Sequence, residues 1–110
     1  MSFQEVGSVE ELEDAISDGQ SMVVFSKDQC PACNTMKHWL DQKFLPTHAG
    51  GPLKVVVAKL EKIGRDAVAD FNLRTMPTTV LFNQGDEVYR VAGFAGPTPV
   101  EQALQAHLIV

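Results

Sequence analysis

Two cysteines, Cys30 and Cys33, are separated by two residues in the segment FSKDQCPACNTMKHWL and are the only cysteines of the chain. Three kinds of site have this C-x-x-C spacing: a redox-active dithiol, half of a metal site, and a pair of packed core thiols. A redox pair needs a thiol that readily becomes a thiolate, whereas a metal site needs further ligands. The residues around the two cysteines therefore decide between these chemistries.

The position of Cys30 favours a reactive thiol. It follows a continuous apolar run at 22–25, typical of a buried strand, and Pro31 directly after it begins a predicted helix. At a helix start, unpaired backbone N–H groups and the positive end of the helix dipole stabilise a thiolate, which is the form that attacks disulfides. Cys33 lies one turn further on, close enough to attack a mixed disulfide on Cys30. We therefore predict an exposed nucleophile at Cys30 and a buried resolving thiol at Cys33.

The metal and core alternatives have weaker support. His38 completes a C-x2-C-x4-H pattern that resembles the start of a zinc knuckle, but Lys43 stands where the fourth ligand is needed. His48 and His107 lack the paired spacing of common zinc sites. We predict no metal in the monomer, while a metal shared by two C-x-x-C motifs across a dimer stays open. The alternative that both cysteines are packed core thiols also stays open, although the polar residues before the first cysteine favour a chemical role.

The composition indicates one domain over residues 1–110. A hydrophobic fraction of 45% is enough for one continuous core. The formal net charge of -5 and the scattered lysines and arginines argue against nucleic-acid binding, which needs a basic surface. No signal peptide is visible, and no apolar stretch reaches the ~20 residues that cross a membrane. We therefore expect a monomer in the reducing cytoplasm, where cysteines at this spacing are more often catalytic or metal-binding than structural.

Helical and strand-like segments alternate along the chain. Ser8 and Glu11 form a capping box that opens a helix. Thr98 and Glu101 form a second box that opens a C-terminal helix, with Pro99 at its first position. The predicted order is a short strand at 3–6, a helix ending at Gly19, a strand at 22–25, a helix from Pro31 to Phe44 ended by Pro46 and the glycines at 50–51, a strand at 53–60, a helix at 65–71, strands at 78–82 and 87–91 joined by a turn at 83–86, and the C-terminal helix.

This order predicts an α/β fold. Strands separated by helices imply right-handed crossovers and a parallel part of a sheet, and the last two strands add an antiparallel hairpin. We expect a central mixed sheet of four to five strands with helices on both faces. In such a sheet, chemistry takes place at the carboxyl ends of the strands, where loops meet helix starts. Cys30 lies at such a point.

Two further stretches complete the pattern. The motif TMPT at 75–78 opens the strand TTVLF, and Gly93 follows the last strand in VAGFAG. Together with CPAC after a buried strand, they resemble the thioredoxin superfamily, and the order of helices and strands is similar over essentially the whole chain. The resemblance implies the thioredoxin fold, with Pro77 as a cis-proline facing the two cysteines and the Met76 backbone pairing with a bound substrate. The implied substrate platform consists of Pro31, Ala32, Met76, Pro77 and Gly93.

The chain combines features of two branches of this superfamily. The stretch MPTTVLFNQGDEVYRVAGF is similar to thioredoxins, and Lys59 stands where thioredoxins have a lysine behind the active site. The stretch VVFSKDQCPAC is similar to glutaredoxins, and this likeness implies that Lys27 contacts glutathione. Against glutaredoxin, the Gly-Gly-Asp type of corner that holds glutathione is not intact, because residues 92–98 read AGFAGPT.

Two positions depart from the thioredoxin pattern. Gln29 replaces the tryptophan that usually precedes the first cysteine, and Val24 replaces a buried aspartate. Without this carboxylate, another group or water must take the proton of Cys33. Lys59 then has no partner at Val24, and Glu61 is the nearest acid in the sequence. Our hypothesis is that Lys59 lowers the pKa of the thiols through its charge.

We predict a thiol–disulfide oxidoreductase that reduces protein disulfides by dithiol exchange. Cys30 attacks the substrate and Cys33 resolves the mixed disulfide, which leaves a redox-active Cys30–Cys33 disulfide and requires no other cofactor. The electrons would come from a thioredoxin reductase or from glutathione. A glutathione-dependent glutaredoxin is the first alternative, and a non-enzymatic thioredoxin-fold subunit of a larger assembly, which would need neither cysteine, is the second. Trp39, on the cysteine helix, is predicted to pack rather than to contact substrate.

Overall fold

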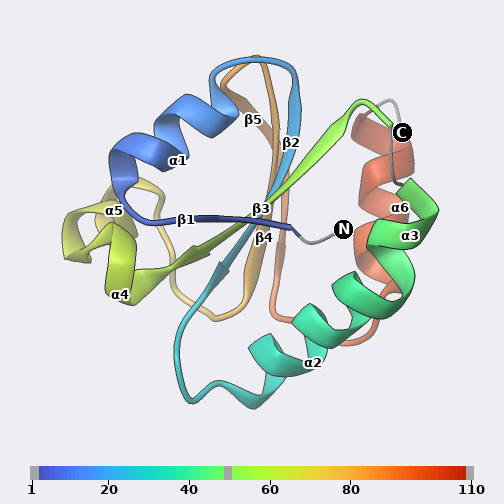
Figure 1. Ribbon diagram of the computed structural model, residues 1–110, viewed down its shortest axis with the longest axis horizontal. Helices are drawn as coiled ribbons and strands as arrows, with labels where there is room; N and C mark the ends of the chain where they lie inside the picture. Colours follow the sequence, from blue (N-terminus) through green and yellow to red (C-terminus); the bar gives the residue numbers. More distant parts are fainter. Residues whose placement is uncertain (1–2, 49–50, 109–110) are drawn as a thin grey trace.

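The computed structural model describes residues 3–48 and 51–108, with a five-stranded mixed sheet at its centre (Figure 1). Gly50, one of the glycines predicted to end the second helix, lies outside the described residues. The strands, in the spatial order β1-β3-β2-β4-β5, are β1 (Gln4–Val6), β3 (Leu53–Lys59), β2 (Gln20–Ser26), β4 (Thr78–Asn83) and β5 (Asp86–Ala92). β1, β3 and β2 are parallel, whereas β4 is antiparallel to both β2 and β5. The predicted mixed sheet is confirmed.

Helices cover both faces of the sheet, as predicted (Figure 1). One face carries α1 (Val9–Ile16), α4 (Leu60–Ile63) and α5 (Arg65–Asp70), and the other carries α2 (Pro31–Trp39), α3 (Leu45–His48) and α6 (Thr98–His107). A π-helical segment, η1 (Leu40–Phe44), joins α2 to α3. The sheet therefore separates two apolar layers, one under each set of helices.

β2 is the central strand, and the cysteine segment follows it. Its side chains alternate: Val23 and Phe25 pack toward α1 and α5, while Met22 and Val24 pack toward α2 and α6. All four are fully buried. Burying an apolar side chain of this size contributes roughly 1.5–3 kcal/mol. This strand is therefore firmly anchored up to Ser26, the last residue before the loop to the cysteines.

The second helix does not end at Phe44, where the sequence pattern places its end. The chain keeps turning to His48 through η1, in which the N–H of Leu45 donates to the carbonyl of Leu40, five residues back. Pro46 has no N–H and interrupts a regular α-helix. A wider π turn directly before the proline changes the helix type and lets the chain continue. The prediction that Pro46 ends this helix is wrong.

The end of β3 and the start of α6 also differ from the prediction. β3 ends at Lys59 and α4 follows directly, whereas the apolar pattern extends the strand to Leu60 and indicates no helix there. At the other end of the chain, α6 already includes Thr98, and the carbonyl of Pro97 accepts the N–H of Glu101 at 3.0 Å. Pro97 is therefore the N-cap, and no side chain caps this helix. The capping box predicted at Thr98 is wrong because the helix starts one residue too early for it.

The capping box of α1 and the turn of the last hairpin are confirmed, whereas α1 ends at Ile16 and not at Gly19. The hydroxyl of Ser8 accepts the N–H of Glu11 at 3.2 Å, and the Glu11 carboxylate accepts the N–H of Gly7 at 3.2 Å. Gln84 and Gly85 form the two-residue turn between β4 and β5, with φ angles of 53° and 87°. Two positive φ angles are what a type I′ hairpin turn requires.

Candidate active site

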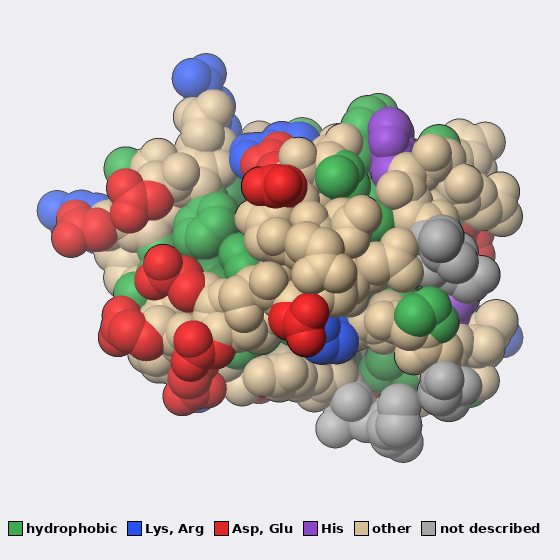
Figure 2. All heavy atoms as spheres, turned by 90° about the horizontal axis from the view of Figure 1, so that it is seen from above, with side chains coloured by type: hydrophobic (Ala, Val, Ile, Leu, Met, Phe, Trp, Pro, Cys, Tyr) green, Lys and Arg blue, Asp and Glu red, His purple; other side chains and the backbone are tan. Residues whose placement is uncertain are grey.

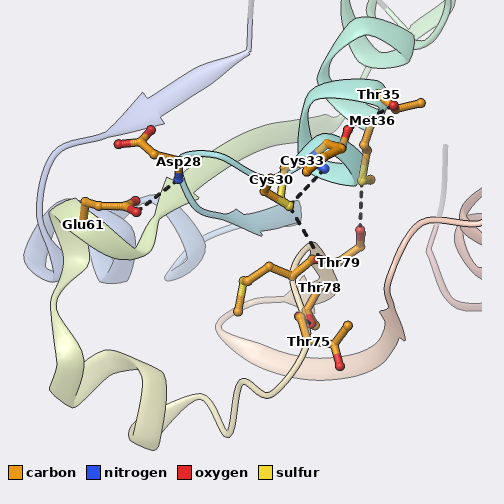
Figure 3. The surroundings of a disulfide bond; sticks show 11 residues. Asp28, Cys30, Cys33, Thr35, Met36, Glu61, Thr75, Thr78 and Thr79 are labelled. Atoms are coloured by element: carbon orange, nitrogen blue, oxygen red, sulfur yellow. Dashed lines mark hydrogen bonds between the residues drawn. A yellow bond between two sulfur atoms is a disulfide. The ribbon is translucent and has the colours of Figure 1, made fainter.

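The two cysteines lie where β2 gives way to α2. Cys30 is the N-cap of α2, with extended backbone at φ -123°, and Pro31 is the first helical residue. Cys30 and Cys33 form a disulfide, with their Cα atoms 5.2 Å apart (Figure 3). The sequence prediction of a redox pair at a helix start therefore agrees with the geometry. Among residues 3–48 and 51–108, no group of three or more histidine, cysteine or acidic side chains is arranged to hold a metal ion.

The helix start supplies a hydrogen bond to the first sulfur. The N–H of Cys33 donates to the Sγ of Cys30 at 3.2 Å, and the N–H of Asn34 donates to the Cys30 carbonyl at 3.0 Å. α2 has no acidic residue in its first turn to oppose a negative charge. After reduction, the same N–H and the positive end of the helix dipole favour a thiolate on Cys30 over one on Cys33. This arrangement can generate a nucleophile at Cys30.

The nucleophile is less exposed than predicted. The exposed fraction is 5% for Cys30 and 0% for Cys33. The Sγ of Cys30 lies 3.8 Å from the carbonyl oxygen of Met76, which belongs to the loop before β4. This loop and the disulfide together cover Cys30. The prediction of an exposed Cys30 is wrong, but the order of accessibility holds, since Cys33 is completely enclosed.

The loop before β4 and the end of β5 meet beside the disulfide. The Met76–Pro77 peptide bond is cis, and Pro77 is buried while Met76 is half-buried. The N–H of Gly93 donates to the carbonyl of Pro77 at 2.7 Å, which ties the two segments together. Gly93 has φ 74°, and a Cβ there would meet open space. Met76 and its neighbour Pro77 thus lie beside Cys30 and are tied to Gly93, while exposed Pro31 and half-buried Ala32 directly follow Cys30 in α2. That these residues receive a substrate strand stays a prediction.

The polar groups near Val24, beneath the cysteine helix, are hydroxyl groups and not a carboxylate. Val24 is fully buried and lies in register with Thr79 of β4 and Val57 of β3. The buried hydroxyl of Thr79 donates to the Sδ of Met36 on α2 at 3.7 Å (Figure 3). Two residues further along β2, the buried Ser26 hydroxyl has no hydrogen-bond partner among the described residues. No motif or spacing in the sequence indicates a role for either hydroxyl.

Lys59 has acidic partners that the sequence did not indicate. Its Nζ lies 3.2 Å from Asp28 Oδ1 and 3.9 Å from Glu5 Oε1. The hydrogen bond from Lys59 to Asp28 and the charge of that carboxylate raise the pKa of Lys59, with Glu5 adding to the effect. Glu61 instead accepts the backbone N–H of Asp28 at 3.1 Å (Figure 3). The lysine charge is thus directed at the loop just before Cys30.

This network predicts opposite effects of two charge changes on Cys30. Lys59→Met removes a positive charge near the loop, so the midpoint pH of Cys30 alkylation is expected to rise by on the order of 0.3 units in the reduced protein. Asp28→Asn leaves the lysine charge uncompensated, so the midpoint is expected to fall by a similar amount. Iodoacetamide labelling across pH, followed by mass spectrometry, measures both shifts. Lys62→Met, an exposed lysine in α4, is the matched control. An unshifted midpoint in Lys59→Met would contradict the proposed role of this lysine.

Lys27 is exposed three residues before Cys30, and its contact with glutathione stays a prediction. Trp39 is half-buried and packs as predicted, with ring centroids 5.1 Å from Phe44 and 5.7 Å from Phe94.

None of the helices in the described part of the chain is long and apolar enough to cross a membrane.

Comparison with known proteins identifies the fold and the family. Residues 10–108 match the sequence profile of the thioredoxin-like domain family. No curated protein sequence gives a significant match. Among solved structures, the chain is similar to a thioredoxin of Malassezia sympodialis, with a TM-score of 0.84 and 21% identity over 97% of this chain and 94% of that one. Mitochondrial thioredoxin 3 of Saccharomyces cerevisiae, in its oxidised form, gives a TM-score of 0.80 at 20% identity over 94% of each chain.

Plasmodium falciparum thioredoxin is also similar, with a TM-score of 0.82 and 18% identity over 94% of this chain and 97% of that one. At such identities the likeness shows the fold, which is the thioredoxin fold expected from the CPAC and TMPT motifs. The matched profile covers nearly all of the described residues, including both cysteines. The chain therefore belongs to the thioredoxin-like domain family.

Proposed function

We propose that this protein reduces disulfides of other proteins by dithiol exchange through Cys30 and Cys33. The thioredoxin fold with a disulfide-linked C-x-x-C pair supports a thiol–disulfide oxidoreductase. The observation that carries the proposal is the hydrogen bond from the Cys33 N–H to the Cys30 sulfur at the start of α2. It distinguishes the two sulfurs, because only Cys30 is stabilised as an anion there and only Cys30 has any exposed surface.

The reaction proceeds in two exchanges. The Cys30 thiolate attacks one sulfur of a substrate disulfide, forms a mixed disulfide with it, and releases the other substrate sulfur as a thiolate that takes a proton from water. Cys33 then loses its proton and attacks the Cys30 Sγ. This step breaks the mixed disulfide, releases the second substrate thiol and forms the Cys30–Cys33 disulfide. Two electrons have passed from the protein dithiol to the substrate.

The oxidised protein needs an external reductant, which we propose to be a thioredoxin reductase or glutathione in a reducing cytoplasm. A second candidate function is a glutathione-dependent glutaredoxin, which exposed Lys27 beside the cysteine loop favours. Both functions involve a monomer and disulfide-bearing partners, so the electron donor distinguishes them.

A pair of coupled assays tests the proposal. One contains NADPH and thioredoxin reductase, the other NADPH, glutathione and glutathione reductase, and both use insulin as the disulfide substrate. We expect NADPH oxidation that depends on this protein in the first assay. Lys27→Ala should leave that rate unchanged. Turnover only with glutathione, lost in Lys27→Ala, would favour the glutaredoxin function. Turnover in neither assay would contradict both and favour a binding subunit.

A further inference from the structure

An apolar groove opens next to the candidate active site, between α2 and the loop that leads from β5 to α6. Its volume is about 380 Å³. Trp39 of α2 and Phe94 of the loop form its aromatic wall, with ring centroids 5.7 Å apart, and Pro97 extends the apolar surface. Figure 1 shows α2 and this loop side by side below α6. Both aromatic side chains are only half-buried, so their remaining surface faces the groove.

The groove has one lysine and no acidic side chain among its described lining residues. Exposed Lys43 lines it together with exposed His38. This differs from the chain as a whole, which has 14 acidic and 9 basic residues. On the face drawn in Figure 2, Asp and Glu side chains gather on the side of α1, α4 and α5 (left in Figures 1 and 2). Lys43 therefore favours a ligand with an acidic group in this groove.

The groove begins where the substrate platform ends. Phe94 directly follows Gly93, whose N–H is bonded to the carbonyl of Pro77. On the other wall, Thr35 and Trp39 lie five and nine residues after Cys30, or about 7.5 and 13.5 Å along a helix with a rise of 1.5 Å per residue. An extended peptide advances roughly 3.3 Å per residue. A segment linked to Cys30 therefore reaches the aromatic wall about two to four residues from its reacting cysteine.

We propose that this groove binds the segment next to the reactive cysteine of a protein substrate, and that it prefers an aromatic side chain beside an Asp or Glu. The inference rests on the proposed disulfide exchange and adds the substrate class. The aromatic side chain packs between Trp39 and Phe94, and the carboxylate pairs with Lys43. Gly96, at φ 91°, adds no side chain to this side, and a Cβ there would meet open space, so the groove stays open.

Peptide disulfides of defined sequence test the proposal. Each peptide carries one cysteine linked to thionitrobenzoate, with Phe-Glu or Ala-Lys placed two to four residues to either side. The Cys30 thiolate attacks the peptide sulfur and displaces thionitrobenzoate, whose absorbance reports the rate, and Cys33 then releases the peptide thiol. In single turnover with reduced protein, the best Phe-Glu peptide is expected to react about tenfold faster than its Ala-Lys counterpart.

Variants assign this preference to the groove. Phe94→Ala is expected to reduce the ratio of the two rates to about two, and Lys43→Glu to lower it by favouring the Lys peptide. Lys62→Glu, the same charge reversal on exposed α4, should keep the full ratio. Because each ratio is taken within one variant, a change in overall activity does not alter it. Equal rates for all peptides, or a ratio that survives both groove substitutions, would overturn the inference.

Further controls separate the other occupants and the underlying function. Failure to reduce even dithiobis(nitrobenzoate) would contradict the proposed function itself, whereas reduction of this small disulfide without peptide preference contradicts only the groove. A mixed disulfide of glutathione that reacts faster than every peptide, and loses this advantage in Phe94→Ala, would assign the groove to glutathione. A dimer in sedimentation that Lys43→Glu dissociates would assign it to a second copy of the chain. Either result would overturn a peptide occupant.

Discussion

Replacing Cys33 with serine is expected to leave substrate proteins covalently attached to Cys30, while replacing Cys30 is expected to abolish turnover. In Cys33→Ser, the first exchange still occurs, because the backbone N–H at position 33 remains and continues to stabilise the Cys30 thiolate. The second exchange has no attacking thiol, so the mixed disulfide persists. In Cys30→Ser, the remaining thiol is fully enclosed and has no access to a protein disulfide. We expect a loss of at least about a thousandfold in insulin reduction for either variant.

Intact-mass spectrometry after incubation with a disulfide-bearing protein measures both outcomes. Cys33→Ser should gain the mass of one substrate chain, and dithiothreitol should remove it. The double variant with both cysteines replaced is the matched control and should gain nothing. Equal trapping through Cys33 in Cys30→Ser would show that the two roles are assigned the wrong way round.

Local sequence signals predicted much of the fold because their partners are close in the chain. The Ser8–Glu11 cap involves residues three apart, and the Gln84-Gly85 turn depends on its own backbone angles. The continuous apolar run of β2 indicated burial on both faces, since each face packs against a different helix layer. By contrast, the π turn before Pro46 was not predicted. Proline chemistry forbids a regular helix there but does not say whether the chain stops or changes its helix type.

The candidate site shows the same difference between local motifs and tertiary contacts. Cys30, Cys33 and Pro77 could be predicted because they belong to short sequence motifs, whereas the positions of the surrounding polar groups depend on tertiary contacts. Asp28 meets Lys59 across 31 positions of sequence, and Thr79 meets Met36 across 43. Pairing β2 with β4 would have placed Thr79 beside Val24, but the register is fixed only in the folded sheet. The cover over Cys30 likewise comes from a loop 46 positions away.

The missing acid at Val24 gives the second large effect. Val24→Asp places a carboxyl group at a fully buried position, flanked by Thr79 and Val57, while the nearby cation Lys59 is already held by Asp28. The Thr79 hydroxyl can donate one hydrogen bond to it, in place of its contact with Met36 Sδ. Desolvation without a cation favours the neutral acid and raises its pKa in the folded state. We expect the free energy of unfolding at pH 7 to fall by about 3 kcal/mol.

The pH dependence of this loss follows from the direction of the shift. Well below the pKa of about 3.9 of an unfolded aspartate, the new carboxyl is protonated in both the folded and unfolded states, so only the polar burial remains unfavourable. As pH rises, the unfolded chain loses this proton first and is stabilised. The difference in the free energy of unfolding between Val24→Asp and the unsubstituted protein therefore grows until the folded carboxyl also ionises. Urea unfolding at pH 4, 5.5 and 7 measures this difference. Val24→Asn has the same shape but does not titrate, so its free energy of unfolding should be lowered by the same amount at every pH. A loss in Val24→Asp that does not change with pH would contradict the raised pKa.

The same substitution is expected to speed the resolving step while it weakens the fold. Cys33 must lose a proton before it attacks Cys30, and at present no carboxylate lies beside it in the strands beneath α2. A carboxyl at position 24 with a raised pKa is suited to accept that proton, as a general base near neutral pH. Stopped-flow measurement of peptide release from a preformed mixed disulfide on Cys30 isolates this step. We expect the peptide to be released about tenfold faster in Val24→Asp. In Val24→Asn we expect the rate of release to stay unchanged. An unchanged rate would mean that water already removes the proton without delay, so that the valine has no kinetic effect and favours stability alone.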